Sequence, residues 1–297
     1  MVFLYSSDLS ADTATAIRAR VTAEAVRRKA PAHVLAWGGD PSWVETLPFP
    51  VRPDVASGKR PITLRFRLRH FTREALRRLE ALKPSVIHAT TPVAVAPAVL
   101  HKLRHPSTRL VFEIHGIAFL ETRELRLPAR LTFGLLDFLG ARCADAVIGM
   151  SYTQRELLRR WFRVRPEKVH VLWGPVDLAM FAYEDPQPAP PLLVGYSGND
   201  RFWQGVHTIL DAAQLLRGHD DIRFVLMGFP KERYLERNLP NVDFLGVPAR
   251  DDVPKLLSRC HALLSPRVGG LVADSQYPFK LSAYLALGRP IIASIVS

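Results

Sequence analysis

A lysine near the end of the chain occupies an unusual helical position. The segment Asp274 to Tyr277 has the composition of a loop, Pro278 favours the first helical position, and Gly288 favours the residue after the last. Lys280 is therefore expected in the first helical turn, where the helix dipole disfavours a cation unless an anion lies nearby. A solvated lysine is the alternative at this stage.

A second junction of strand and helix, farther upstream, carries a similar cation. Residues 192–196 are an apolar run, residues 197–200 form a turn, Arg201 follows, and residues 205–216 place apolar side chains at helical spacing. In an open α/β sheet both junctions lie at the carboxyl edge, where ligands bind. Two cations and two helix N-termini at one edge predict a diphosphate site.

The elements that must position these residues alternate between strand and helix along the chain. Strands are predicted at residues 2–5, 33–37, 85–89, 109–114, 146–150 and 169–172, and again near residues 192, 223, 242, 262 and 290. Helices are predicted at residues 12–29 with Asp12 as N-cap, at 73–82 and 93–103, and after Ser151, which forms a capping box with Gln154. This alternation predicts an α/β fold with parallel sheets.

Composition limits the class of protein. The chain has 297 residues, 48% of them apolar and 23% charged, which suits two globular domains. The apolar run at the start of the chain is too short for the hydrophobic region of a signal peptide, and no later apolar run is long enough to span a bilayer. We therefore expect a cytoplasmic protein. Cys143 and Cys260 are far apart in sequence and predict two buried free thiols rather than a disulfide or a metal site.

Two nucleotide-binding classes are excluded by their motifs. Gly195 and Gly198 do not form the Gly-x-Gly-x-x-Gly pattern, and the strand that ends at Gly228 lacks the acidic residue that would bind an NAD ribose. The chain also lacks a Gly-Lys-Ser or Gly-Lys-Thr phosphate loop. A dehydrogenase or a P-loop enzyme is therefore not expected.

The net charge of +12 is concentrated in the first part of the chain. Residues 1–184 hold 28 Lys and Arg against 17 Asp and Glu, whereas residues 185–297 hold 12 against 11. No nucleic-acid-binding signature accompanies this charge, so we expect no nucleic acid partner. The run from Arg65 to Arg78 alternates arginine with Phe and Leu, which fits an anionic membrane surface. An arginine-rich composition without a partner is the alternative.

Four motifs in order resemble one enzyme family. They are Gly-Tyr-Ser-Gly (195–198), Trp-Gln-Gly-Val (203–206), Phe-Leu-Gly-Val-Pro (244–248) and the segment from Pro278 to Ser294, and together they are similar to the nucleotide-sugar-binding half of the family 4, group 1 glycosyltransferases. The resemblance implies the GT-B fold, an α/β architecture of two Rossmann-like domains that face a cleft. It implies a donor diphosphate held by Arg201 and Lys280, and a base that meets the backbone of residues 246–248.

The resemblance also assigns donor-binding positions and shows one departure. The matching positions are Gly198, Arg201, Gln204, Gly246, Val247, Pro248, Asp274, Ser275, Lys280, Leu281 and Ala283. Members of the family commonly carry two glutamates at the places of Ser275 and Ala283, the second of which grips the donor ribose. Ala283 cannot form that hydrogen bond.

The first half of the chain has three candidate site residues. His115 directly follows a strand, and the resemblance implies that it contacts the sugar or the developing charge. Asp8 and Glu121 are the acceptor-side candidates by the same resemblance. The alternatives are a structural histidine, a turn aspartate and a glutamate near a helix N-terminus.

The function expected from the resemblance is a metal-independent, retaining transfer of a sugar from a nucleotide-diphosphate sugar to a glycan or lipid-linked acceptor, such as a cell-surface glycan precursor, on the inner face of a membrane. No cofactor is expected. The expected domains are residues 1–176, a linker at 177–191, and residues 192–297, a second domain expected to be truncated because members of the family continue with further elements. The alternative is a weakly active or inactive relative that binds a nucleotide or a partner.

Overall fold

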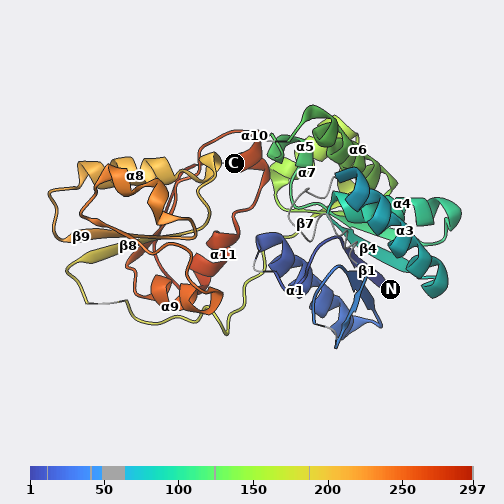
Figure 1. Cartoon of the computed structure of the whole chain (residues 1–297), viewed down its shortest axis with the longest axis horizontal. Helices are drawn as coiled ribbons and strands as arrows, with labels where there is room; N and C mark the ends of the chain where they lie inside the picture. Colours follow the sequence, from blue (N-terminus) through green and yellow to red (C-terminus); the bar gives the residue numbers. More distant parts are fainter. Residues whose placement is uncertain (12, 41, 49–63, 124, 187, 296–297) are drawn as a thin grey trace, which may run out of the picture. The chain divides into compact units, whose positions relative to one another are not determined.

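The chain folds into two compact units, Met1–Trp173 and Gly174–Ser297. The computed structural model describes residues 1–11, 13–40, 42–48, 64–123, 125–186 and 188–295. Each unit is a parallel β-sheet with helices packed on it (Figure 1). The predicted α/β fold with two Rossmann-like domains, the architecture of GT-B proteins, is confirmed.

Unit 1 is built on a sheet of seven parallel strands in the order β3-β2-β1-β4-β5-β6-β7. The strands are β1 (Val2–Tyr5), β2 (His33–Ala36), β3 (Val44–Thr46), β4 (Val86–Thr90), β5 (Arg109–Glu113), β6 (Ala146–Gly149) and β7 (Val169–Val171). The helices between them are α1 (Ala14–Lys29), α3 (Leu64–Leu82), α4 (Pro92–Arg104), α5 (Ala118–Glu121), α6 (Leu127–Cys143) and α7 (Tyr152–Phe162). The strand order reverses between β1 and β4, which makes that point a natural ligand site.

Unit 2 repeats the architecture with five parallel strands in the order β10-β9-β8-β11-β12. The strands are β8 (Leu192–Ser197), β9 (Ile222–Met227), β10 (Val242–Phe244), β11 (Ala262–Ser265) and β12 (Ile291–Ala293). The helices are α8 (Val206–Leu215), α9 (Val253–Ser258), α10 (Leu271–Ser275) and α11 (Phe279–Ala286). Here the order reverses between β8 and β11.

Both faces of the unit 2 sheet are buried, as a parallel sheet requires. One face packs against α8 through Tyr196, Ile209 and Phe224. The other packs against α9 and α11 through residues that include Leu263 and Tyr284. Because α11 is held by this second cluster, the position of its first turn is fixed relative to the end of β8.

Most of the predicted helices and strands are present in the structure, whereas a few elements differ in their boundaries or were not predicted. Helix α1 begins at Ala14, and its N-cap is Thr13, whose side chain accepts from the backbone N–H of Ala16 at 3.2 Å; Asp12 lies outside the described residues. The oxygen of Ser151 caps α7 at 3.0 Å as predicted. Helix α3 begins at Leu64, earlier than predicted, and β3 and α6 were not predicted at all.

The segment predicted as a linker, residues 177–191, makes contacts within unit 2, which spans Gly174–Ser297. The guanidinium of Arg289 donates to the carbonyl of Glu184, and the hydroxyl of Ser258 donates to the Glu184 carboxylate at 3.0 Å. These partly buried hydrogen bonds attach Glu184 to the rest of unit 2.

Two compositional expectations can be compared with the structure. None of the helices in the described part of the chain combines the length and the hydrophobicity that crossing a bilayer requires. Cys143 and Cys260 are both free thiols; Cys260 is buried, and Cys143 is only partly so. Burial raises the pKa of Cys260 to about 11, so its thiol is unreactive near neutral pH.

Candidate functional site

The loops that follow β8 and β11 meet at the carboxyl edge of the unit 2 sheet. The backbone N–H of Val268 donates to the carbonyl of Trp203 at 3.1 Å. Gly205 has a φ of +71°, and a Cβ at this residue would lie 1.6 Å from the carbonyl oxygen of Pro266. Only glycine fits such a close approach of two backbones, which explains the Gln-Gly-Val motif. The loops are therefore joined where the strand order reverses.

Three glycines continue this edge across β8, β9 and β10. Gly198, Gly228 and Gly246 have φ values of +149°, +104° and +66°. The N–H of Gly228 donates to the carbonyl of Gly246 at 2.7 Å, and a Cβ at Gly228 would lie 2.5 Å from the carbonyl oxygen of Gly198. The edge is thus lined by backbone without side chains, which lets a ligand approach closely.

Lys280 places its ammonium against this edge. The Nζ atom lies 3.8 Å from the centre of the Tyr196 ring, and a Cβ at Gly198 would be only 2.7 Å from it. This nitrogen is buried and has no hydrogen-bond partner among the described residues. Burial, together with the positive charge of Arg267, lowers the pKa of Lys280 well below its usual value. A buried ammonium without an acceptor fits a site made for an anion.

Helix α11 is fixed by hydrogen bonds on both sides of Lys280. The hydroxyl of Tyr284 accepts from the backbone N–H of Ser197 at 2.9 Å, and Ser282 donates to the carbonyl of Gly174 at 2.7 Å. The N-cap is Pro278, which offers no side-chain cap to the first-turn N–H groups. The first turn of α11 is therefore without a capping side chain, and an uncapped helix N-terminus attracts an anion.

The remaining donor-side candidates are spread around this centre. Arg201 is exposed, lies three residues after Gly198 and stacks on the Trp203 ring at 5.2 Å, and the buried side-chain oxygen of Gln204 has no hydrogen-bond partner among the described residues. Val247 is exposed, while Pro248 and Leu281 are partly buried. The loop and helix positions thus surround one edge, and their roles toward a donor stay predictions.

The positions where glutamates were expected are engaged elsewhere. Ser275 is buried, and its hydroxyl donates to the carbonyl of Val272 at 3.2 Å. Ala283 packs against the core cluster that includes Tyr284. Asp274 lies in α10, where a carboxylate oxygen is 3.5 Å from the backbone nitrogen of Gly270. The roles of these three positions toward a donor stay predictions.

Unit 1 contains a buried charged cluster that the sequence did not reveal. Glu113, at the end of β5, accepts from Nε of Arg18 and from Nε2 of His88 at 2.9 Å. The same Arg18 donates to the backbone carbonyls of Trp173 and Leu172 at 2.8 and 2.9 Å. Burial would raise the pKa of Glu113, but hydrogen bonds from His115 and His88 outweigh it and hold that pKa well below the usual range. The cluster ties α1 to the carboxyl ends of β4, β5 and β7.

His115 extends this cluster outward. Its Nε2 lies 3.2 Å from a carboxylate oxygen of Glu113, and its buried Nδ1 has no hydrogen-bond partner among the described residues. Since an ionised carboxylate only accepts, Nε2 carries the proton, and Nδ1 is an acceptor in the neutral ring. A single histidine after a strand was a sufficient signal for His115, whereas Glu113 looked like an ordinary strand residue.

The two acceptor-side carboxylates differ in their surroundings. Glu121 folds over Gly116, where a Cβ would lie 1.4 Å from its Oε1, so the structure brings Glu121 next to the backbone that follows His115. Asp8 accepts from the backbone N–H and the hydroxyl of Ser10 at 2.8 and 2.7 Å. Its carboxylate is thus engaged in a local turn, which is what an ordinary turn aspartate does.

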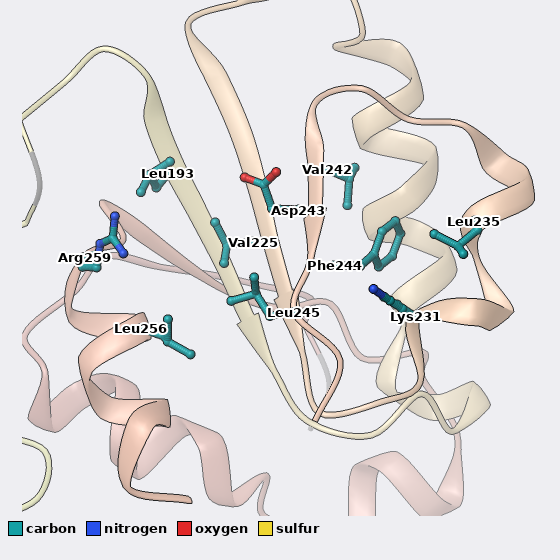
Figure 2. A pocket seen from close by; sticks show the side chains of 10 residues that line it. All are labelled: Leu193, Val225, Lys231, Leu235, Val242, Asp243, Phe244, Leu245, Leu256 and Arg259. Atoms are coloured by element: carbon teal, nitrogen blue, oxygen red, sulfur yellow. The ribbon is translucent and has the colours of Figure 1, made fainter. Parts of the chain in front are cut away.

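A pocket elsewhere in unit 2 does not coincide with the candidate site. It has a volume of about 560 Å³ and lies around the outer strand β10, as Figure 2 shows. Its lining includes Asp243, Phe244, Leu245 and Arg259 but none of the predicted site residues. The candidate site is therefore the glycine-lined edge with Lys280, and this pocket is separate from it.

Two family models match the sequence of this chain. The model of Glycosyltransferase Family 4 matches residues 19–180, and that of Glycosyl transferases group 1 matches residues 191–297. No curated protein matches the sequence significantly. Among solved structures, sucrose-phosphate synthase from Thermosynechococcus elongatus aligns over 100% of this chain and 81% of its own, with a TM-score of 0.75 and 17% identity.

Two further structures have the same fold. HepE from Anabaena, solved in complex with UDP-glucose, aligns over 98% of this chain and 79% of its own, with a TM-score of 0.66 and 18% identity. The lipopolysaccharide outer core galactosyltransferase WaaB aligns over the same shares, with a TM-score of 0.65 and 14% identity. At these identities the likeness establishes the GT-B fold, and the sequence models establish the family. The chain belongs to glycosyltransferase family 4, and its second half is of the glycosyl transferases group 1 type.

Proposed function

We propose that this glycosyltransferase binds a nucleotide-diphosphate sugar at the carboxyl edge of unit 2 and transfers the sugar with retention of anomeric configuration. The observation that carries the proposal is the buried Lys280 ammonium, which has no hydrogen-bond partner among the described residues and lies beside Gly198. A diphosphate would supply the missing negative charge. The neighbour HepE, of the same fold, was solved with UDP-glucose, which supports this donor class.

The proposed chemistry needs charge stabilisation on the leaving group. When the bond between the anomeric carbon and the diphosphate oxygen breaks, the electron pair stays on the diphosphate. Lys280, the first-turn N–H groups of α11 and the guanidinium of Arg201 would stabilise that charge without a metal ion. The hydroxyl oxygen of the acceptor would form the new bond to the anomeric carbon, and its proton would pass to the departing diphosphate. Nδ1 of His115 would accept a hydrogen bond from a sugar hydroxyl.

The donor proposal is tested by nucleotide binding. We expect UDP, GDP or ADP to raise the melting temperature of the wild-type protein, and Lys280→Ala or Arg201→Ala to weaken binding roughly tenfold to a hundredfold, the loss of a hydrogen bond to a charged group. Lys255→Ala is the matched control, because Lys255 is an exposed lysine on α9. Unchanged affinity in Lys280→Ala for every nucleotide would refute the proposal.

We also propose that the acceptor is lipid-linked and that unit 1 docks on an anionic membrane through α6. The sequence predicted a membrane contact through the arginine-rich run in α3. In the structure Phe71 is buried and Arg67 stacks on Trp37 at 5.1 Å, so these two side chains pack within unit 1 and are not available to a membrane. The exposed apolar residues lie on α6 instead, where Leu127, Leu131 and Leu135 recur four positions apart and are 55–57% exposed. This spacing places them on one face of the helix.

Membrane docking is tested with vesicles. Binding to phosphatidylglycerol vesicles should weaken as salt is added, because unit 1 carries the excess of arginine and lysine. Leu131→Asp with Leu135→Asp should abolish it, whereas Leu215→Asp, at a leucine of unit 2 that is 85% exposed, should not. Equal binding to neutral vesicles would exclude an electrostatic contribution, and binding that survives the α6 changes would exclude this helix.

A second candidate is a relative that binds the donor but transfers it poorly. The observation in its favour is Ala283, which packs against the core where members of the family carry a glutamate. Release of free nucleotide from the donor that binds most tightly, measured with and without membrane acceptor, separates the two functions. Tight binding without release would favour the inactive relative.

A further inference from the structure

Three side chains on two neighbouring helices of unit 1 form a cluster of metal-ligand type. His101 and His105 lie four positions apart at the end of α4, and Glu80 lies near the end of α3, which packs along α4. One ligand atom from each residue can be chosen so that all three lie within 4.8 Å of one another. Sequence analysis considered only the cysteines as metal ligands and therefore missed this cluster.

The separations between these atoms are close to those of a tetrahedral zinc site. Nδ1 of His101 lies 3.5 Å from one oxygen of Glu80, and Nε2 of His105 lies 2.8 Å from the other. Ligands about 2.0–2.1 Å from a zinc ion at tetrahedral angles are roughly 3.3 Å apart. Small side-chain rotations would bring the three atoms to that spacing, since the two imidazoles are already 4.4 Å apart between ring centres.

One histidine of the cluster is buried without a hydrogen bond. His101 is 1% exposed, and its Nδ1 has no hydrogen-bond partner among the described residues. The nearby Glu80 oxygen, Oε1, has none either. Buried polar atoms without a hydrogen-bond partner are uncommon in proteins, and a bound ion or water is one way to satisfy them. Here the two unsatisfied atoms are 3.5 Å apart and belong to the two groups that a cation would join.

The chemistry of the three side chains suits a divalent cation, because carboxylate oxygens and imidazole nitrogens are ligands that zinc takes in proteins. Glu80 already lies within 3.5 Å of both histidines, so a cation placed between them would meet all three groups. A cation would replace the proton shared between Glu80 and His105. The competing positive group is Arg104, 3.8 Å from Glu80, and its side chain is exposed enough to turn away.

We propose that Glu80, His101 and His105 bind a zinc ion, with a water molecule as fourth ligand, and that this ion clamps the ends of α3 and α4 together. His₂Glu with water is a known ligand set for zinc. Glu80 and His105 are 41% and 42% exposed, which gives the ion a path from solvent. Because α4 starts at the carboxyl edge of the sheet and has 13 residues, the site lies about 20 Å from that edge. The ion is thus structural.

The test is zinc binding to the full chain without an affinity tag. After removal of metal with EDTA, calorimetry with Zn²⁺ should show one equivalent bound and release of protons, and zinc should raise the melting temperature. Cobalt(II) added instead should give the strong visible absorption of a tetrahedral ion. Glu80→Gln and His105→Ala should each weaken zinc binding at least about tenfold. Replacing a residue that only hydrogen-bonds to a metal ligand already costs about tenfold to a hundredfold, and a ligand should matter no less.

Matched controls distinguish this site from adventitious binding by surface histidines. His219→Ala removes an exposed histidine that lies 3.8 Å from Asp221 and belongs to no metal-ligand cluster among the described residues, so it should leave zinc binding unchanged. Both ligand variants change partly exposed side chains, so they should fold, and their circular dichroism in EDTA should match that of the wild type. Failure of the wild type to bind zinc, or undiminished binding in both folded variants, would overturn the proposal. Nucleotide binding in unit 2 does not enter this test.

Discussion

The ammonium of Lys280 lies 3.8 Å from the centre of the Tyr196 ring and is buried without donating a hydrogen bond to any described residue. A cation above an aromatic face gains up to about 2 kcal/mol when it is desolvated. Removing an ammonium from water costs more than this, so the arrangement is unfavourable until an anion arrives. The buried Lys280 ammonium thus lowers the unfolding free energy of the ligand-free protein and favours the binding of an anion.

This balance predicts that Lys280→Met stabilises the protein while removing its donor binding. Methionine has a similar length, fills the space over Tyr196, and carries no charge to desolvate. We expect the unfolding free energy in urea to rise by about 1–3 kcal/mol without nucleotide, within the range found when buried charges are replaced by apolar groups. A decrease in stability would indicate that Lys280 has a partner in the free protein.

Because the pKa of Lys280 is lowered, the gain in stability expected for Lys280→Met depends on pH. Between its folded-state pKa and the value of 10.5 expected in the unfolded chain, the unfolded chain holds one more proton, so the stability contributed by Lys280 rises with pH. The advantage of Lys280→Met over the wild type should therefore be greatest at low pH and should shrink as pH rises toward 10.5. Urea unfolding of both proteins from neutral pH to about pH 10 measures this difference. A constant advantage would contradict the burial of the ammonium.

The glycine-lined edge predicts an unequal response to alanine. Gly228→Ala places a Cβ 2.5 Å from the carbonyl oxygen of Gly198 at a φ of +104°, so it should cost at least about 1–2 kcal/mol and weaken nucleotide binding. Gly218→Ala is the control, because nothing lies within 4 Å of its Cβ. Thermal unfolding and nucleotide titration of both variants provide the measurement. Equal effects would show that the edge tolerates side chains.

Sequence patterns predicted the alternation of strands and helices because each element of a parallel sheet carries its own apolar periodicity and turn residues. The first turn of α11 was also predictable, since Pro278 and Gly288 define the ends of that helix. Helix α6 was not predicted from the sequence. Its residues Leu127, Leu131 and Leu135 are exposed, so its apolar residues do not mark a single buried face.

Contacts between distant residues were beyond the reach of these patterns. Nothing in the sequence pairs Arg18 with Glu113, which are 95 positions apart, or Glu80 with His105. The lack of a hydrogen-bond acceptor for Lys280 among the described residues is likewise a property of the packed structure. The chemistry of single positions could thus be predicted from sequence, whereas their burial and their partners could not.

The buried cluster around Glu113 leads to the last prediction. Glu113→Gln leaves the Arg18 guanidinium buried without its counter-charge, which should lower the unfolding free energy by about 3–5 kcal/mol at neutral pH. Because the folded-state pKa of Glu113 lies well below 4.5, its contribution is fully present above pH 4.5 and is lost as pH falls toward the folded-state pKa. The wild type and Glu113→Gln should therefore converge in stability in acid. Glu156→Gln is the control, since Glu156 pairs with Arg159 and Arg160 in solvent and its replacement should matter little despite a pKa lowered to about 2. Urea unfolding measures both losses. An equal loss of unfolding free energy in Glu113→Gln and Glu156→Gln would show that burial does not strengthen the ion pair between Arg18 and Glu113.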